Sequence, residues 1–292
     1  MTLVAVVAHR NKDFGGGLRE LRERLRAEGV DEPIWLEVDK SRQAPKRVRR
    51  ALKLGAERVI VWGGDGMVQK CVDVLAGTDA IIGILPAGTA NLFATNLGIP
   101  SDLEGALEVA LHGTLRRLDV GTVNGEHFAV MAGTGFDARM IKEADRGLKD
   151  RIGQAAYVWT GAKAVGTPPQ GTRVRVDGHT WFKGKASCVL VGNVGQIGKG
   201  VHAFADAQPD DGLLDVGVVT ASTRVQWLRV IARMITGKPT RSKLVHATRG
   251  RNIDVRLDHK ALYELDGGDR SPSKRLKIRV EPRAITVCVP SS

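Results

Sequence analysis

The sequence is poor in aromatic residues and cysteines, and it contains no long apolar run. Of its 292 residues, only 4% are Phe, Trp or Tyr and three are Cys. No apolar run approaches the ~20 residues that a membrane-spanning helix requires. The scarcity of aromatic side chains leaves few platforms on which single-stranded nucleic acid could stack. A membrane-spanning protein and a single-strand binder are therefore both disfavoured.

The cysteines and histidines form no metal-binding or catalytic pattern. Cys71, Cys188 and Cys288 are isolated and odd in number, and the apolar run Leu3–Ala8 is too short for a secretory leader. We expect buried packing cysteines and a cytoplasmic protein. None of the seven histidines forms a metal pair or a triad, and there is no Walker A sequence and no protein-kinase catalytic loop.

The formal net charge of +12 suits an anionic partner, either nucleic acid or an acidic membrane face, and does not choose between them. The sequence lacks zinc-finger spacing, an RNP-type motif and a basic region joined to heptads. We therefore expect no nucleic-acid partner. Much of the charge can also be ordinary solvated surface.

The length indicates two domains, and the pattern of predicted secondary structure changes near Leu118. Residues 1–118 alternate apolar strand-like runs with amphipathic helical patterns, which predicts a Rossmann-like parallel α/β domain. Residues 119–292 contain many short strand-like runs, among them 276–280 and 284–289, with turns such as Asn124-Gly125 between runs. This pattern predicts an antiparallel β-sandwich. Helical segments are expected within it at about 148–164 and 224–236.

Two glycine-rich turns follow two apolar runs that are typical of neighbouring buried strands. The run Val59–Trp62 leads into Gly63, Gly64, Asp65 and Gly66, and the run Ala80–Leu85 leads into Gly88, Thr89 and Asn91. A helical pattern follows each turn, and the first of these helices is expected to start near Met67. Both turns should therefore lie at the carboxyl ends of parallel strands, where open α/β sheets bind ligands. Glycines let backbone N–H groups approach an anion, and a helix N-terminus adds positive charge there. The pair of turns favours a nucleotide site over an ordinary tight turn.

Asp65 lies in the middle of the first turn, where a bare carboxylate would repel phosphates. Its presence makes chemical sense if it holds Mg²⁺ or accepts a proton from an attacking hydroxyl. Phosphoryl transfer needs both roles to be filled. Asp65 is therefore a candidate metal ligand and a candidate catalytic base.

Seven short segments carry a stronger family signal than either turn alone. They are Gly63–Gly66, Pro86–Asn91, Asn96–Pro100, Gly135–Ala138, Gly192–Gly195, Asp210–Val216 and Leu265–Gly267. In order along the chain, they resemble the diacylglycerol kinase catalytic family, which includes bacterial lipid kinases and sphingosine kinases. The resemblance implies an ATP- and Mg²⁺-dependent kinase that transfers the γ-phosphoryl group to a lipid hydroxyl, in the first instance that of diacylglycerol to give phosphatidic acid. It also implies a nucleotide cleft between the two domains.

The two turns and the resemblance together nominate site residues. The nucleotide-binding set is Lys12, Gly63, Gly64, Asp65, Gly66, Gly88, Thr89 and Asn91. The catalytic set is Asp65, Asp211 and Asp269, the metal-binding set is Asp65 and Asp210, and Asp137 is the candidate contact to the lipid headgroup. Without the family, Asp210 and Asp211 would be interpreted as a turn between strands, and Thr89 and Asn91 as helix caps.

The chain departs from the family pattern at several of these places. The first loop has no Asn-Pro, Met67 stands where Thr is common, Lys70 where Glu is common, and Asp269 is shifted by Gly268 from the usual position of a Glu. Two alternatives therefore stay open. One is an NAD kinase-like enzyme, which shares the Gly-Gly-Asp-Gly turn. The other is a catalytically altered protein that binds nucleotide or lipid.

The basic amphipathic segment 224–236 has two interpretations. It can lie on an anionic membrane, or it can pack on the sheet with its arginines in water, which we favour. The expected partner is a lipid substrate at an anionic membrane surface, reached by peripheral contact. A homodimer is an open alternative, because the sequence does not determine the oligomeric state.

Overall fold

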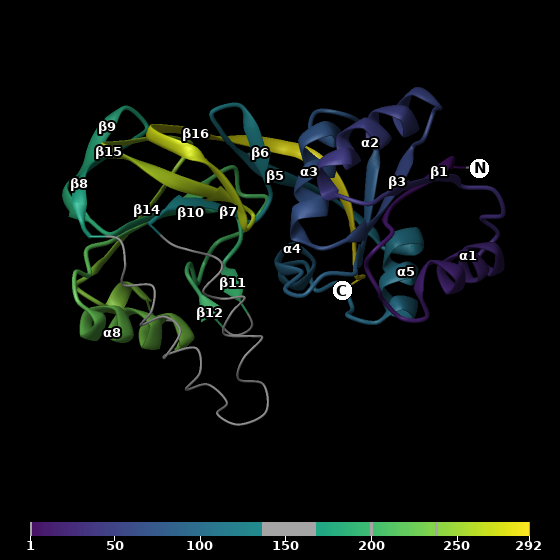
Figure 1. Ribbon diagram of the computed structural model, residues 1–292, viewed down its shortest axis with the longest axis horizontal. Coiled ribbons are helices and arrows are strands. Elements are labelled where there is room, and N and C mark those ends of the chain that lie inside the picture. The colour runs from purple at the N-terminus through teal and green to yellow at the C-terminus, as the bar shows by residue number, and fades with distance from the viewer. Residues whose placement is uncertain (1, 136–167, 199–200, 237–238, 292) are drawn as a thin grey trace. The chain divides into compact units, whose positions relative to one another are not determined.

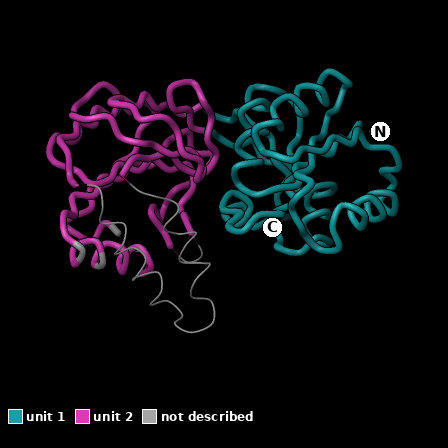
Figure 2. Tube along the Cα trace, in the orientation of Figure 1, with its two compact units in different colours: residues 1–120, 282–292 teal, residues 121–281 magenta. Residues whose placement is uncertain are grey.

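The computed structural model describes residues 2–135, 168–198, 201–236 and 239–291 (Figure 1). The chain forms two compact units, residues 1–120 with 282–292, and residues 121–281 (Figure 2). The sequence placed the division at 118/119 and assigned everything after it to the second domain. The structure differs at the C-terminus, because the last strand returns to the first unit and pairs with its sheet.

The first unit is built on a parallel sheet with strand order β2-β1-β3-β4. The strands are β1 (Val4–His9), β2 (Ile34–Val38), β3 (Arg58–Gly63) and β4 (Ile81–Pro86). The closing part of β16 (Gly268–Val289) adds a fifth parallel strand, where Thr286 lies opposite Ile81. The central strands are continuous apolar runs that are buried almost throughout, as expected when helices cover both faces of a parallel sheet.

Helices connect these strands. They are α1 (Gly17–Ala27), α2 (Ala44–Lys53) with the short 3₁₀ turn η1 (Ser41–Gln43) before it, α3 (Asp65–Leu75), α4 (Leu92–Asn96) and α5 (Leu103–His112). Each longer helix buries one stripe, such as Leu21 and Leu25 on α1. Asp102 caps α5, because its carboxylate accepts a hydrogen bond from the N–H of Gly105 at 2.7 Å.

The second unit is an antiparallel β structure. The chain enters it along β5 (Thr114–Val123) and leaves it along β16. Its other strands are β6 (Glu126–Phe128), β7 (Met131–Thr134), β8 (Gln170–Val176), β9 (His179–Ala186), β10 (Cys188–Gly192), β11 (Gln196–Gly198), β12 (Val201–His202), β13 (Leu214–Val219), β14 (Val245–Gly250) and β15 (Asn252–Leu265). One layer runs β14-β13-β10-β7 and the other contains β9-β8-β15-β16. The long strand β15 joins them, since its first half pairs with β8 and its end with β7.

One apolar core lies between the two layers of the second unit. It includes Val174, Val191, Val216, Val255 and Leu276, all at most 1% exposed. The strands contribute alternate residues to this core, so their other residues face outward. The predicted fold class, a parallel α/β domain followed by a β-sandwich, is confirmed.

Helix α8 (Arg224–Ile235) packs within the second unit, and the 3₁₀ turn η2 (Pro239–Arg241) follows it. Its apolar residues Trp227, Val230 and Met234 are buried and line a small apolar cavity with residues of β10, β13 and β14. The favoured interpretation of this helix, packing on the sheet, is the one that the structure shows. The helix expected at 148–164 lies outside the described residues.

Candidate functional site

The two glycine turns of the first unit lie against each other. A Cβ atom added to Gly88 would come 2.4 Å from the Cα of Gly64, and one added to Gly64 would come 3.0 Å from the Cα of Gly88. The N–H of Ala87 also donates to the carbonyl of Gly63 at 3.1 Å. The turns can meet this closely only because neither glycine carries a side chain. The expectation that the two turns share one edge of the sheet is therefore met.

Asn91 organises the second turn from within. Its Oδ1 accepts the N–H of Gly88 at 2.9 Å, and its Nδ2 donates to the carbonyls of Pro86 at 2.8 Å and Gly88 at 2.9 Å. Its backbone is left-handed, with φ of 48°, a conformation that Asn tolerates better than most residues. The side chain makes no capping bond to α4, so the capping role is not observed. Thr89 is exposed at the tip of the turn.

Asp65 is the first residue of α3, and Gly64 before it is the N-cap, with extended backbone. The predicted helix began near Met67, two residues late. The Asp65 carboxylate accepts the N–H of Phe93 in the first turn of α4 at 3.2 Å. The side chain is half-buried between the starts of two helices, whose N–H groups favour negative charge. A carboxylate in this place can orient a cation or take a proton beside bound phosphates.

Met67, which departs from the family pattern, has a packing role. It is 1% exposed, and its Cβ lies only 2.5 Å from the position that a Cβ on Gly63 would occupy. The side chain therefore covers Gly63 from the helix side. Met67 thus offers an apolar contact at a position where Thr would offer a hydroxyl.

Lys12 lies in the loop after β1. Contacts with Trp62, a residue of β3, hold this loop against the strand. The indole Nε1 of Trp62 donates to the carbonyl of Lys12 at 3.0 Å, and Phe14 packs edge-on against the Trp62 ring at 5.6 Å between centroids. Because Trp62 immediately precedes Gly63, the backbone of Lys12 is attached directly beside the first glycine turn. The sequence offered no signal for Trp62 as an anchor, apart from its place in a buried strand.

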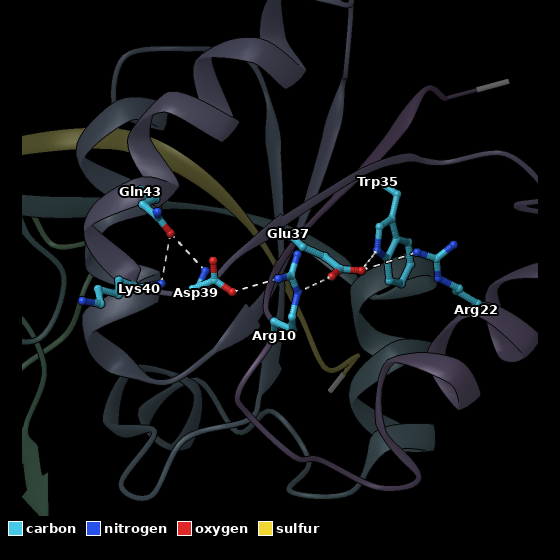
Figure 3. Close-up of polar contacts among 7 residues, drawn as sticks. All are labelled: Arg10, Arg22, Trp35, Glu37, Asp39, Lys40 and Gln43. Carbon is cyan, nitrogen blue, oxygen red and sulfur yellow. Dashed lines mark hydrogen bonds and ion pairs between the residues drawn. The ribbon is translucent and has the colours of Figure 1, made fainter.

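An ionic network secures the start of the same loop (Figure 3). Arg10 pairs with Glu37 and with Asp39, each at 3.0 Å, and Glu37 also accepts the indole N–H of Trp35 at 2.7 Å. The hydrogen bonds from Trp35 and Arg10 hold the pKa of the Glu37 carboxyl below its usual value. Arg22 stacks on the Trp35 ring at 3.9 Å. The loop is therefore joined to β2 and α1 as well as to β3.

His9 ends β1 at the base of this loop. Its Nδ1 is buried without a hydrogen-bond partner among the described residues. Burial, and next the nearby charge of Lys12, lower the pKa of the imidazole from its ordinary value. The ring is thus held neutral beside the loop that carries Lys12. No local pattern in the sequence marks His9 as a buried, neutral side chain.

The second unit holds the predicted carboxylates Asp210 and Asp211 in an exposed turn before β13. Asp211 Oδ1 accepts the N–H of Leu213 at 3.0 Å, and Arg249 on β14 lies 3.7 Å from Asp211 and 3.0 Å from Asp215. Burial raises the pKa of the Asp215 carboxyl, and the Arg249 guanidinium opposes that rise. The sequence did not reveal Arg249 as the partner of this turn, because it lies on a different strand.

Asp266 and Asp269 have different surroundings although they are close in sequence. Asp266 is buried, and its carboxylate accepts the N–H groups of Ala129 at 2.8 Å and of Val130 and Met131 at 2.9 Å each. It thereby holds the segment before β7 in place. Asp269 is exposed on β16, opposite Glu264 on β15. Asp266 is structural in this arrangement, whereas the exposed carboxylate of Asp269 is accessible to a ligand.

The structure thus forms two candidate groups. The first unit brings together Lys12, Gly63, Gly64, Asp65, Gly66, Gly88, Thr89 and Asn91 in the two turns and the neighbouring loop. The second unit carries Asp210, Asp211 and Asp269. Asp137 lies outside the described residues. The functional roles of all these residues, and the cleft expected between the domains, stay predictions.

Two family descriptions match the chain. Residues 10–123 match the diacylglycerol kinase catalytic domain, and residues 130–289 match the YegS C-terminal NAD kinase beta sandwich-like domain. No helix among the described residues is long and apolar enough to cross a membrane.

Relatives match over nearly the whole length. The chain is 31% identical over 277 residues to a "Probable lipid kinase YegS-like" of Klebsiella pneumoniae, covering 94% of this chain and 91% of the relative. It is 30% identical over 279 residues to a "Probable lipid kinase YegS" of Salmonella arizonae, with the same coverage.

Solved structures share the fold. A diacylglycerol kinase structure from Bacillus anthracis superposes with a TM-score of 0.76 at 19% identity, covering 99% of this chain and 97% of that one. An NAD kinase from Archaeoglobus fulgidus in complex with ATP superposes less closely, with a TM-score of 0.53 at 14% identity and coverage of 98% and 92%. From the domain matches and the full-length relatives, the chain belongs to the diacylglycerol kinase catalytic-domain family of lipid kinases, with a YegS-type C-terminal β-sandwich.

Proposed function

We propose that this lipid kinase transfers the γ-phosphoryl group of ATP to the free hydroxyl of diacylglycerol, giving phosphatidic acid and ADP. The observation that carries the proposal is the contact between Gly64 and Gly88 at the carboxyl ends of β3 and β4, with Asp65 held between the starts of α3 and α4. Bare backbone, two helix N-termini and one carboxylate make a site suited to phosphates with a bound cation.

In this proposal, the turns of the first unit bind the nucleotide. Backbone N–H groups around Gly64 and Gly66 donate to phosphate oxygens, and the bare Cα of Gly88 leaves the second turn without a side chain in their way. Lys12 contributes a positive charge from the loop beside Trp62. Asn91 positions the second turn through its three hydrogen bonds. Mg²⁺ bound with the nucleotide would offset phosphate charge; Asp65 is the candidate ligand for it in the first unit, and Asp210 is the candidate in the second.

The remaining step is removal of the proton from the acceptor hydroxyl. Asp65 and Asp211 are the candidates for accepting it as the new bond to phosphorus forms and the bond to the β-phosphate oxygen breaks. Asp269 offers a further exposed carboxylate, and Asp137 is proposed to contact the polar headgroup. Since positioning and electrostatics supply most of the rate in phosphoryl transfer, the precise arrangement of these turns matters more than any single proton acceptor.

Because diacylglycerol resides in a bilayer, the proposal includes peripheral contact with an anionic membrane surface. The net charge of +12 supports it, since basic proteins are attracted to acidic lipid. Sphingoid bases and other lipid alcohols are the competing acceptors. The fold likeness to an NAD kinase makes NAD the acceptor to test outside the lipids.

The deciding experiment measures label transfer from γ-labelled ATP·Mg²⁺ in detergent micelles. Diacylglycerol, sphingosine, a total lipid extract and NAD are offered separately, with Asp65→Asn as the blank. Label in phosphatidic acid supports the proposal, and label in another organic-phase product reassigns the acceptor within the lipids. Label only in NAD contradicts the lipid assignment. ATP binding without transfer to any acceptor would indicate a protein that binds nucleotide without kinase activity.

A further inference from the structure

One face of the second unit is strongly basic. It consists of the outward-facing side chains of β8, β9, residues 254–258 of β15 and residues 275–281 of β16, and we call it the basic sheet face. These strands lie side by side in Figure 1. Eight exposed Lys and Arg residues stand on it against three carboxylates, a local net charge of +5 within the chain's +12.

Strand alternation determines which side chains belong to this face. On β8, Val174 and Val176 point into the apolar core, so Arg173 and Arg175 point outward. On β16, Leu276 and Ile278 are in the same core, so Lys277 and its cationic neighbours point outward. A register slip would bury these cations, so the apolar core itself fixes the charge on the surface.

A row of four cations crosses the face. The pairing register places Lys183, Arg173, Arg256 and Arg275 directly opposite one another on β9, β8, β15 and β16. Asp254 neutralises part of the row, at 3.4 Å from Arg256 and 2.7 Å from Arg275. Lys183 and Arg173 form no ion pair with any described residue. Like charges opposed across strands destabilise a sheet, so packing gives no reason for this row.

The next row lies beside a hollow of about 680 Å³. Arg175, Asp254 and Lys277 are opposite one another, and Lys277 forms no ion pair within the described parts of the chain. The hollow is lined by four cations, one carboxylate and two neutral amides: Arg175, Arg275, Lys277, Arg279, Asp254, Asn124 and Asn252. Arg275 pairs with Asp254 and Arg279 pairs with Glu281, each at 2.7 Å, so the cations still outnumber the one carboxylate of the lining. Cations and amides around an open hollow present hydrogen-bond donors to an anionic group that approaches from solvent.

We infer that the basic sheet face binds the surface of an anionic phospholipid bilayer, with lipid phosphates in contact with the cationic rows. This inference rests on the proposed function, which needs a membrane-resident acceptor. A sheet presents its cations across a broad face, and long Lys and Arg side chains suit a surface of many phosphates. The face suits single-stranded nucleic acid poorly, since the aromatic residues of β9, Trp181 and Phe182, pack against the core.

The test is sedimentation of the full-length protein with phosphatidylcholine vesicles, with and without phosphatidylglycerol, and with no nucleotide present. The variant Arg173→Glu/Lys183→Glu/Lys277→Glu reverses three cations that form no ion pair with the residues that the structure describes. A matched control, Lys46→Glu/Arg49→Glu/Lys53→Glu, makes the same change in net charge on exposed positions of α2. Circular dichroism and thermal melting confirm the fold of both, and a Gln version of the sheet variant guards against misfolding.

We expect the wild type and the α2 variant to bind anionic vesicles. The partition coefficient of the sheet variant should be lower than that of the wild type by at least about tenfold. The partition coefficient of the Gln version should lie between those of the wild type and the sheet variant. Equal losses in the two Glu variants, or no binding by the wild type, would overturn the inference. Competition by duplex DNA that removes the wild type from vesicles, with DNA binding itself lost in the sheet variant, would reassign the face to nucleic acid.

Vesicle binding separates this inference from the proposed kinase activity. The sheet variant should phosphorylate a short-chain diacylglycerol in neutral detergent micelles at the wild-type rate, because none of its three residues belongs to the nucleotide or catalytic set. If the wild type shows no kinase activity but binds anionic vesicles through this face, the proposed function fails and the surface assignment stands. Loss of micellar activity in a folded sheet variant would contradict a pure docking role.

Discussion

The carboxylate of Asp65 and the backbone N–H of Phe93 join the start of α3 to the start of α4 through a 3.2 Å hydrogen bond. Asp65 belongs to the first glycine turn and Phe93 to the helix that follows the second, so this bond adds to the direct contact of Gly64 with Gly88. Asp65 is thus both a candidate catalytic group and part of the scaffold. A useful variant must remove its charge without removing the hydrogen bond.

Asp65→Asn meets that requirement, because the amide oxygen can still accept the N–H of Phe93. We expect kcat to fall by about 10²–10⁴-fold, as when a charged group is removed from proton transfer or metal binding. Label transfer from ATP to lipid in micelles measures the loss, and thermal unfolding checks that the fold persists. Full activity in a folded Asp65→Asn protein would remove Asp65 from the catalytic and metal-binding sets.

Gly88→Ala tests the close approach of the turns. Its Cβ would lie 2.4 Å from the Cα of Gly64 and 2.5 Å from Oδ1 of Asn91, so the turns must separate. We expect both a lower melting temperature and at least about tenfold weaker ATP binding, since the turn that would hold phosphate is displaced. Isothermal titration with ATP·Mg²⁺ and differential scanning fluorimetry measure the two effects.

Gly66→Ala is the matched control, since a Cβ there meets nothing within 4 Å. In a helix, Ala is favoured over Gly by about 0.5–1 kcal/mol, so the melting temperature should hold or rise. A methyl group at this exposed position should nevertheless weaken ATP binding, if phosphates approach the bare backbone of the first turn. Unchanged ATP affinity in Gly66→Ala would place the phosphates elsewhere.

The parallel half of the fold was readable from sequence because its signals are local. Apolar β-branched runs such as Val59–Val61 and glycine turns mark strands and their ends within a few residues. The start of α3 was misplaced by two residues because Gly64 in extended conformation serves as the N-cap, a place where side-chain oxygens are usually the signal.

The β-sandwich was predictable as a class but not in its strand boundaries. The strands predicted at 276–280 and 284–289 are one strand, β16, which passes through Pro282 and through Arg283 with φ of 53°. Proline removes an N–H yet keeps an extended chain, so it does not end the strand here. The same strand then returns to the first unit, which local patterns could not reveal.

The parts of the site missed by sequence reasoning depend on contacts between distant residues. Asp266 meets backbone N–H groups that lie 135–137 residues earlier, and Arg249 meets Asp215 across 34 residues. No sequence pattern close to Asp266 or Arg249 indicates which residue it contacts. The family resemblance nominated Asp211 and Asp269, but it did not separate the buried Asp266 from the exposed Asp269.

Asp266→Asn should destabilise the protein, because one amide oxygen cannot replace two carboxylate oxygens that accept three N–H groups. Asn tolerates the backbone φ of 46°, so the effect isolates the lost hydrogen bonding. We expect a loss of about 2–4 kcal/mol in unfolding free energy, measured by urea denaturation.

Asp269→Asn, three residues further along, serves as the comparison. Its exposed carboxylate should contribute less than about 0.5 kcal/mol to stability. A fall in kcat at unchanged stability would support its place in the catalytic set. Equal destabilisation by the two variants would contradict the structural role assigned to Asp266.

His9 makes the first unit sensitive to acid. Burial lowers the pKa of its imidazole below the ordinary value of 6.5, so the unfolded chain binds this proton more readily than the folded one. Above pH 6.5 the imidazole is neutral in both the folded and the unfolded chain, so His9 does not lower the free energy of unfolding. As the pH falls through 6.5, the unfolded chain takes up the proton first and the free energy of unfolding decreases. The decrease is complete below the pKa of His9 in the folded chain. In His9→Asn this contribution is absent. We expect the wild type to lose about 1–2 °C more in melting temperature than His9→Asn between pH 7.5 and pH 5.5. Parallel melting curves for the two proteins would instead show that His9 titrates alike in the folded and unfolded chains.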